Sequence, residues 1–97
     1  MTLVSLARYT NFMHDMHLAD QILKIVLEHV EKNNFNKIKK IELELGSILE
    51  HGEYISPENL IFNFKLLAKN TSAENAELNI KKVSGDEWKL VSIEGGE

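Results

Sequence analysis

The sequence has no cysteine and a single proline in its 97 residues. Without cysteine the chain forms no disulfide bond, offers no thiolate nucleophile and cannot bind zinc through cysteine ligands. Disulfide frameworks are typical of secreted proteins, so their absence favours a cytoplasmic location. The sequence also lacks an apolar run of roughly 18 residues, the length that spans a membrane, and no membrane partner is expected.

An excess of basic residues is missing as well. The formal net charge is −4 at pH 7, whereas nucleic-acid-binding domains usually carry a basic patch, so no nucleic-acid partner is expected. The chain has no glycine-rich phosphate loop and no serine in a recognisable nucleophile context, and we expect that it is not an enzyme. Four carboxylates are formal acid–base candidates that a solvated surface explains better, namely Asp15, Asp20, Glu50 and Glu53.

The length of the chain predicts one domain. Residues 1–12 are mildly apolar, but their apolar piece from Leu3 to Ala7 is shorter than the core of a signal peptide, and no basic residue precedes it. We therefore interpret residues 1–12 as an N-terminal extension and residues 13–97 as the domain.

Two segments have the apolar spacing of helices. The first runs from Met13 to Lys32 and ends at Asn33 and Asn34, because asparagine tolerates the left-handed conformation. Its apolar stripe consists of Leu18, Ile22, Ile25, Val26, His29 and Val30. The second is capped by Ser56, has Pro57 at its first position and runs to about Asn70. Its core stripe consists of Leu60, Ile61, Phe64, Leu67 and Ala68.

The second helix has a wider apolar arc than one core face requires. Phe62 and Leu66 lie beyond the core stripe. Two interpretations stay open, a deeply buried helix or a surface for a protein partner.

Three segments are predicted as strands. Alternation of apolar and polar residues marks two of them, and the third is rich in β-forming residues; their ranges are 37–45, 76–81 and 88–94. Residues 47–55 are expected to form a polar loop. The strand–helix–strand unit makes its two strands parallel, and the tight turn at 84–86 makes the last strand antiparallel. The predicted fold class is α/β (α+β), a three-stranded mixed sheet with two helices on one face.

His14 and His17 are the histidines best placed to bind a metal. They are three residues apart at the predicted start of a helix, so their side chains are neighbours. A cation there is disfavoured by the helix dipole unless its ligands bring negative charge, as deprotonated backbone amides do. Nickel and copper accept such planar nitrogen sets. His29 is more simply explained as a core residue and His51 as an exposed loop residue.

Five segments of the chain carry a resemblance to a known family. They are Met13-His14-Asp15, ahead of the first helix, and residues 40–46, 56–64, 70–78 and 87–94. In this order they resemble the hydrogenase nickel-incorporation (HypA/HybF) family, which begins with Met-His-Glu followed by a helix. The resemblance implies a nickel metallochaperone for [NiFe]-hydrogenase maturation. It also implies two partners, a HypB-like maturation GTPase and the hydrogenase large subunit, with a homodimer left open.

The resemblance also implies a set of nickel(II) ligands. His14 would provide its imidazole and an amide nitrogen, and Asp15 would provide a second amide nitrogen. Met13 would provide the free amine if the chain starts there, and His17 is a replacement ligand.

The sequence departs from the family pattern in three ways. The cysteine-rich zinc module between the last two strands is missing, so no zinc is expected. Asp15 replaces glutamate, a mild change if its backbone amide is the ligand. Met13 follows twelve other residues, so either translation starts at Met13 or the amine ligand is lost. The alternative to nickel delivery is therefore a metal-free docking module that binds a maturation GTPase or a client protein.

Overall fold

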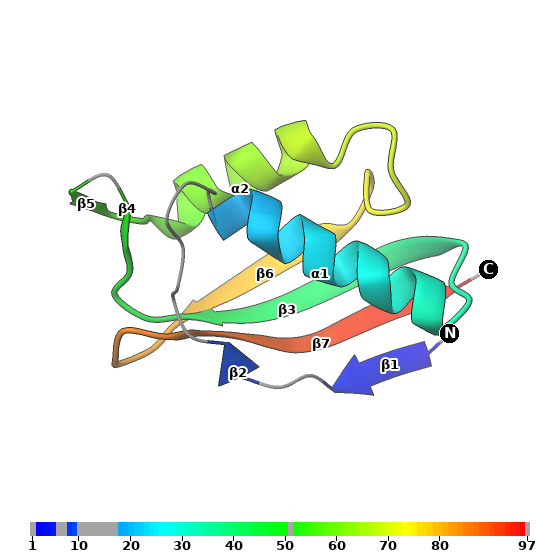
Figure 1. Cartoon of the computed structure of the whole chain (residues 1–97), viewed down its shortest axis with the longest axis horizontal. Helices are drawn as coiled ribbons and strands as arrows, with labels where there is room; N and C mark the ends of the chain where they lie inside the picture. Colours follow the sequence, from blue (N-terminus) through cyan, green and yellow to red (C-terminus); the bar gives the residue numbers. More distant parts are fainter. Residues whose placement is uncertain (1, 6–7, 10–17, 51, 97) are drawn as a thin grey trace.

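The structure is a computed structural model that describes residues 2–5, 8–9, 18–50 and 52–96. Figure 1 shows two helices packed beside a curved sheet. In chain order the elements are β1 (Thr2–Ser5), β2 (Arg8–Tyr9), α1 (Leu18–Lys32), β3 (Lys37–Leu45), β4 (Leu49–Glu50), β5 (Glu53–Tyr54), α2 (Pro57–Leu67), β6 (Glu77–Lys82) and β7 (Trp88–Gly96).

α1 ends where the local signal predicts, because Asn34, two residues after it, takes the left-handed conformation with a φ of 56°. α2 ends at Leu67, three residues before the expected Asn70, and its C-cap is Ala68. At the start of α2 the hydroxyl of Ser56 accepts a hydrogen bond from the N–H of Asn59 at 3.1 Å. The expected beginning of the first helix, residues 13–17, lies outside the described residues.

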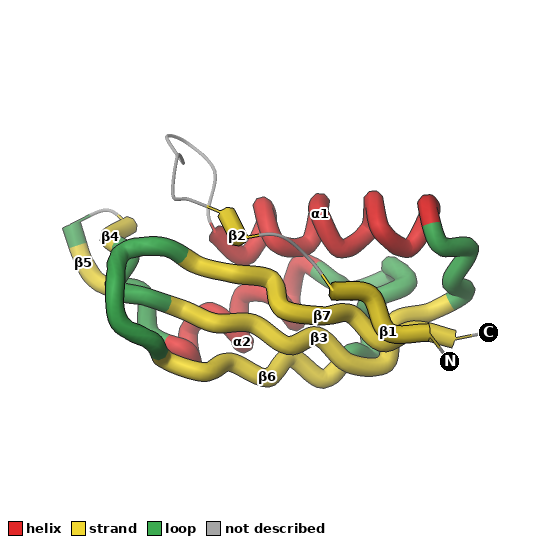
Figure 2. The backbone as a smooth tube through the Cα atoms, turned by 90° about the horizontal axis from the view of Figure 1, so that it is seen from below, coloured by secondary structure: helices red, strands yellow, loops and turns green. Residues whose placement is uncertain are grey.

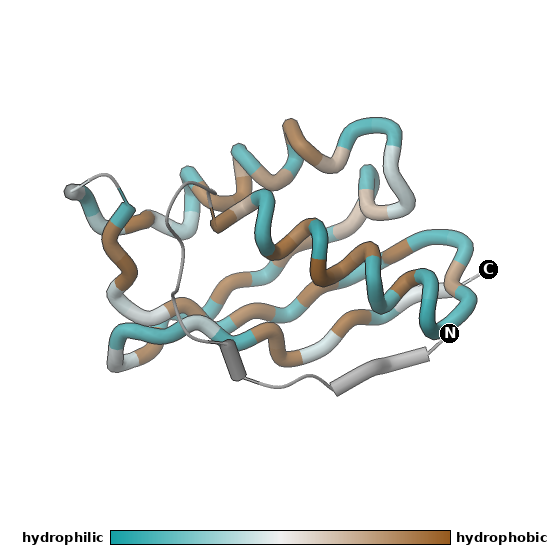
Figure 3. The backbone as a smooth tube through the Cα atoms, in the orientation of Figure 1, coloured by the Kyte–Doolittle hydropathy of each residue, from teal (hydrophilic) through white to brown (hydrophobic). Residues whose placement is uncertain are grey.

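The central part of the sheet is the expected mixed arrangement of three strands. β3 pairs in parallel with β6 and antiparallel with β7. Ile41, Leu43 and Leu45 of β3 are buried, whereas Glu42 and Glu44 between them are partly exposed. Figure 3 shows this alternation of hydrophobic and hydrophilic residues along the strands. The predicted α+β fold, with its helices on one face of the sheet, is confirmed.

The strand order differs from a simple hairpin of the last two strands. β3 lies between β6 and β7, and Figure 2 shows the connection passing around the end of β3. Crossing one strand requires about 10 Å, which residues 83–87 span easily. The N–H of Val83 donates to the carbonyl of Leu45 at 3.0 Å, and the N–H of Gly46 donates to that of Glu87 at 2.9 Å. The expected tight turn is therefore a crossover held by the end of β3.

Two segments that were not expected to be strands join the structure. β1 and β2, from the predicted N-terminal extension, both pair antiparallel with β7 and make the sheet five-stranded. Within the predicted polar loop, β4 and β5 form a short antiparallel hairpin. The sequence lacked a signal for either because both are very short pairings.

One continuous core joins the helices to the sheet. It contains six residues of α1 and both Leu60 and Phe64 of α2, packed with β3, β6 and β7. Trp88 and Phe64 are the largest side chains that are fully buried. Within the described segments, neither helix is long and apolar enough to cross a membrane.

Candidate functional site

The four candidate nickel ligands, Met13, His14, Asp15 and His17, lie outside the described residues. The structure describes what lies directly after them, because α1 begins at Leu18, the residue that follows His17. Leu18 and Ala19 are buried at 1% and 2% exposure and fix the first turn of α1 against the core. The predicted site therefore leads into a firmly packed helix end.

Glu50 of β4 contacts this helix end. Its Oε2 accepts a hydrogen bond from the N–H of Leu18 at 2.8 Å, although the two residues are 32 positions apart in the sequence. Both views place the β4–β5 hairpin at the end of the molecule where α1 begins (Figure 1, Figure 2). Glu50 was predicted to lie on the solvated surface, because no local sequence pattern indicates this contact.

The first turn of α1 has a second carboxylate on its outer side. Asp20 forms an ion pair with Lys24 at 3.2 Å, one helical turn away. Lys24 is exposed and Asp20 is partly exposed, so the pair contributes little to stability. Asp20 nevertheless places negative charge at the positive end of the helix, where it is favourable.

A groove of about 350 Å³ separates the hairpin from α2 beside this helix end. Glu50 and Glu53 are the charged residues that line it. Its other lining residues are Ala19, Tyr54, Ile55, Ser56, Asn59, Leu60, Phe62 and Asn63. The groove therefore combines an acidic wall with the exposed rings of Tyr54 and Phe62.

The other histidines do not form a second metal site in the described part of the chain. His29 is half-buried on α1, and His51 lies outside the described residues. Among residues 2–5, 8–9, 18–50 and 52–96, no three histidine, aspartate or glutamate side chains are placed to share a metal ion.

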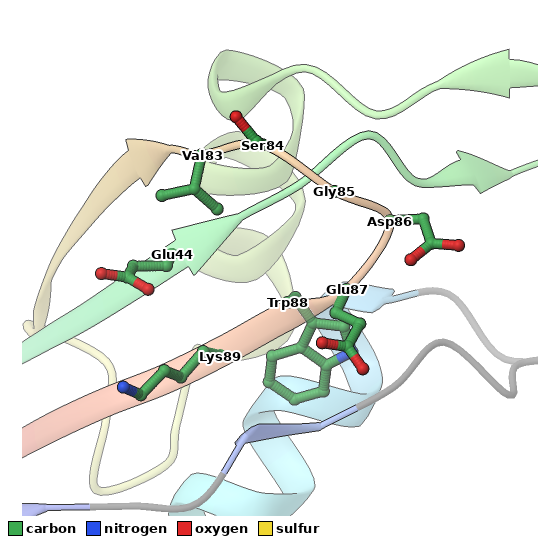
Figure 4. Close-up of a pocket in the computed structure, with 8 residues that line it drawn as sticks. All are labelled: Glu44, Val83, Ser84, Gly85, Asp86, Glu87, Trp88 and Lys89. Atoms are coloured by element: carbon green, nitrogen blue, oxygen red, sulfur yellow. The ribbon is translucent and has the colours of Figure 1, made fainter.

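The crossover between β6 and β7 is the place where the HypA/HybF pattern has its zinc module. Residues 83–89 and Glu44 line a shallow pocket of about 300 Å³ here (Figure 4). Figure 4 shows the carboxylates of Glu44 and Asp86 pointing in opposite directions. The described side chains of this loop therefore do not converge on a common point.

Comparison with known proteins places this arrangement in a family. Residues 13–88 match the family model described as hydrogenase/urease nickel incorporation, metallochaperone, hypA. The chain is 32% identical over 78 residues to the hydrogenase maturation factor HypA of Rhizobium leguminosarum bv. viciae, covering 80% of this chain and 66% of that protein. It is 37% identical over 71 residues to HypA of Lawsonia intracellularis, covering 73% of this chain and 57% of that protein.

The fold agrees with a solved structure. The nickel metallochaperone HypA from Helicobacter pylori superposes with a TM-score of 0.71 at 15% sequence identity, covering 87% of this chain and 98% of that chain. The matches span less than two thirds of the two curated relatives' own lengths. On the family match and the curated relatives, this chain belongs to the HypA family of nickel-incorporation proteins.

Proposed function

We propose that this protein is a nickel metallochaperone that takes part in nickel insertion during [NiFe]-hydrogenase maturation. The observation that supports this most strongly is the family match, which begins at Met13, the first of the candidate ligands. The protein binds and delivers a metal and is not an enzyme. Its location is the cytoplasm, where the hydrogenase large subunit would receive the metal.

Nickel(II) is bound by the segment that precedes α1. His14 provides an imidazole nitrogen and an amide nitrogen, and Asp15 provides a second amide nitrogen. The backbone amide of Leu18 is already hydrogen-bonded to Glu50. This supports the choice of amide ligands from residues that precede Leu18. In the chain as given, Met13 is within a peptide bond, so His17 replaces the free amine in a site of higher coordination number.

The domain boundaries and the metal content follow the same proposal. Residues 13–97 form the nickel-binding domain, and residues 1–12 are an extension of it. The protein holds no structural zinc, because it has no cysteine to bind it. The crossover of residues 83–87 joins the two strands that the zinc module would separate.

The partners are a HypB-like maturation GTPase and the hydrogenase large subunit. The outer face of α2 supports such an interaction, since Phe62 is 62% exposed and Leu66 is 49% exposed. Large apolar side chains grouped on one exposed face are typical of interaction surfaces. A homodimer through this face is the alternative assembly.

A second function is favoured by one observation, the twelve residues that precede Met13. If they remove the amine ligand and no other group replaces it, the chain is a metal-free docking module. It would then bind a maturation GTPase or client protein through α2 without handling nickel.

Calorimetric titration with nickel distinguishes the two functions. The 97-residue chain is compared with its His14→Ala variant, and His29→Ala is the matched control because His29 lies on α1 away from the segment. We expect wild type and His29→Ala to bind nickel alike and His14→Ala to lose binding. Equal affinity of wild type and His14→Ala would contradict nickel delivery through this segment.

A further inference from the structure

The N-terminus of α1 is capped by a side chain from a distant part of the chain. The first N–H groups of a helix have no partner within the helix, and the residue just before the helix usually supplies an acceptor. Here the N–H of Leu18 donates to Oε2 of Glu50 at 2.8 Å. The N–H of the first residue of α1 therefore finds its acceptor on the β4–β5 hairpin.

The chemistry of this contact makes it strong for a single hydrogen bond. A carboxylate acceptor gives a charge-assisted bond, which is shorter and stronger than a neutral one. Its negative charge also lies at the positive end of the helix dipole. The contact is partly buried, so solvent and salt screen it less than an exposed pair.

The hairpin holds Glu50 in place from both of its ends. Ile48, before β4, is 1% exposed, and Ile55, after β5, packs against the core. The N–H of Ile55 donates to the carbonyl of Ile48 at 2.9 Å and closes the base of the hairpin. Glu50 lies opposite Glu53 in the register. The carboxylate that reaches α1 is thus attached to the core and not to a free loop.

We propose that Glu50 is a positioning residue for the metal-binding segment. By fixing the N–H of Leu18, it fixes the point at which the chain leaves α1 toward His17 and His14. This inference rests on the proposed function, because it needs a metal bound by residues 13–17. Groups that orient metal ligands from outside the coordination sphere typically change metal affinity about 10–100-fold when they are removed.

Three variants test this role. Glu50→Ala removes the acceptor, whereas Glu50→Gln keeps an acceptor oxygen at the same chain length. Glu53→Ala is the matched control, because it removes an exposed carboxylate from the same hairpin. Nickel affinity is measured by calorimetry, protection of the Leu18 amide by hydrogen exchange, and folding by thermal unfolding.

Glu50→Ala should bind nickel about tenfold more weakly than wild type, the size expected for a lost orienting contact. Glu50→Gln should restore the affinity to within about threefold, since a neutral acceptor keeps about half the strength of a charged one. Glu53→Ala should match wild type. The Leu18 amide should exchange faster in Glu50→Ala than in the other two variants.

Two results would overturn the inference while leaving the proposed function intact. In the first, Glu50→Ala binds nickel as tightly as wild type, while His14→Ala loses binding. In the second, Glu50→Gln and Glu50→Ala lose the same amount of nickel affinity, which would mean that the charge of Glu50 or its direct ligation of the metal matters and not the hydrogen bond. If His14→Ala binds nickel as wild type does, the proposed function and the inference both fail.

Discussion

Gly46 illustrates how one residue can determine the path of the chain. A Cβ atom at this position would lie 2.6 Å from the carbonyl oxygens of both Gly85 and Glu87. These oxygens belong to the crossover that passes over the end of β3, and they accept hydrogen bonds from the N–H groups of Ser47 and Gly46. The close approach of two backbones therefore excludes a side chain here.

Substitution of Gly46 by alanine should destabilise the fold. The crossover would have to move away from β3, and such overpacking typically costs about 1–3 kcal/mol. Gly96→Ala is the control, since a Cβ there would meet the Lys39 side chain at an ordinary 3.4 Å. Chemical denaturation of the three proteins measures the effect. Equal free energies of unfolding for Gly46→Ala and Gly96→Ala would show that the crossover does not pack as described.

The sequence predicts contacts between neighbouring residues better than contacts between residues that are far apart in the chain. Ser56 and Asn34 act on their own neighbours, so the cap of α2 and the left-handed conformation after α1 follow from local patterns. The contact of Glu50 with Leu18 spans 32 positions and depends on a hairpin that has no strong sequence signal. The sequence identified the ligand candidates, but the residue that holds the adjoining helix end emerged from the fold.

Among the helices and strands, local patterns again predicted more than the arrangement of the elements relative to one another. Hydrophobic periodicity predicted both helices and two of the three central strands, because each pattern is repeated over many residues, and β-forming residues indicated the third. Strand order was not predictable, since a short connection after β6 suits a hairpin and a crossover equally. On α2 the periodicity placed Leu67 in the core, whereas it is 43% exposed. The helix buries Leu60 and Phe64 deeply and leaves the next apolar positions outside.

The outer face of α2 should bind a partner without contributing to stability. The double variant Phe62→Ser and Leu66→Ser should unfold within about 0.5 kcal/mol of wild type, as exposed positions usually do. Its binding to the maturation GTPase, measured by surface plasmon resonance, should fall about tenfold or more, as for interface residues of high energy.

Glu74→Ser serves as the control for this measurement, because Glu74 is exposed in the loop after α2. It should bind like wild type. Unchanged GTPase binding by the double variant would remove α2 from the interface. A large loss of stability in the double variant would instead show that Phe62 and Leu66 belong to the core.

At the scale of the whole molecule, the N-terminal strands and α1 flank the proposed metal-binding segment in the sequence. β1 and β2 pair with β7, and α1 packs in the core that β7 shares. The described elements on either side of residues 10–17 in the sequence therefore belong to one fold.

The 97-residue chain should fold without zinc. One core joins both helices and three strands, and the crossover is held by backbone hydrogen bonds at Val83, Gly46 and Ser47. A strong zinc chelator should therefore leave the midpoint of thermal unfolding unchanged. A fall of several degrees on addition of the chelator would reveal a zinc site that contributes to folding, as structural zinc does.

If His14 anchors nickel, a chain that begins at Met13 should show it in a single titration. Its free amine, two amide nitrogens and the His14 imidazole form a square-planar set, which suits nickel(II). We predict a yellow, diamagnetic complex whose affinity falls as the pH is lowered, because the amides must lose their protons. In calorimetric titration, His14→Ala in this chain should not bind nickel. Equal affinity with and without His14 would contradict the claim, and the metal-free docking function would then be the better explanation.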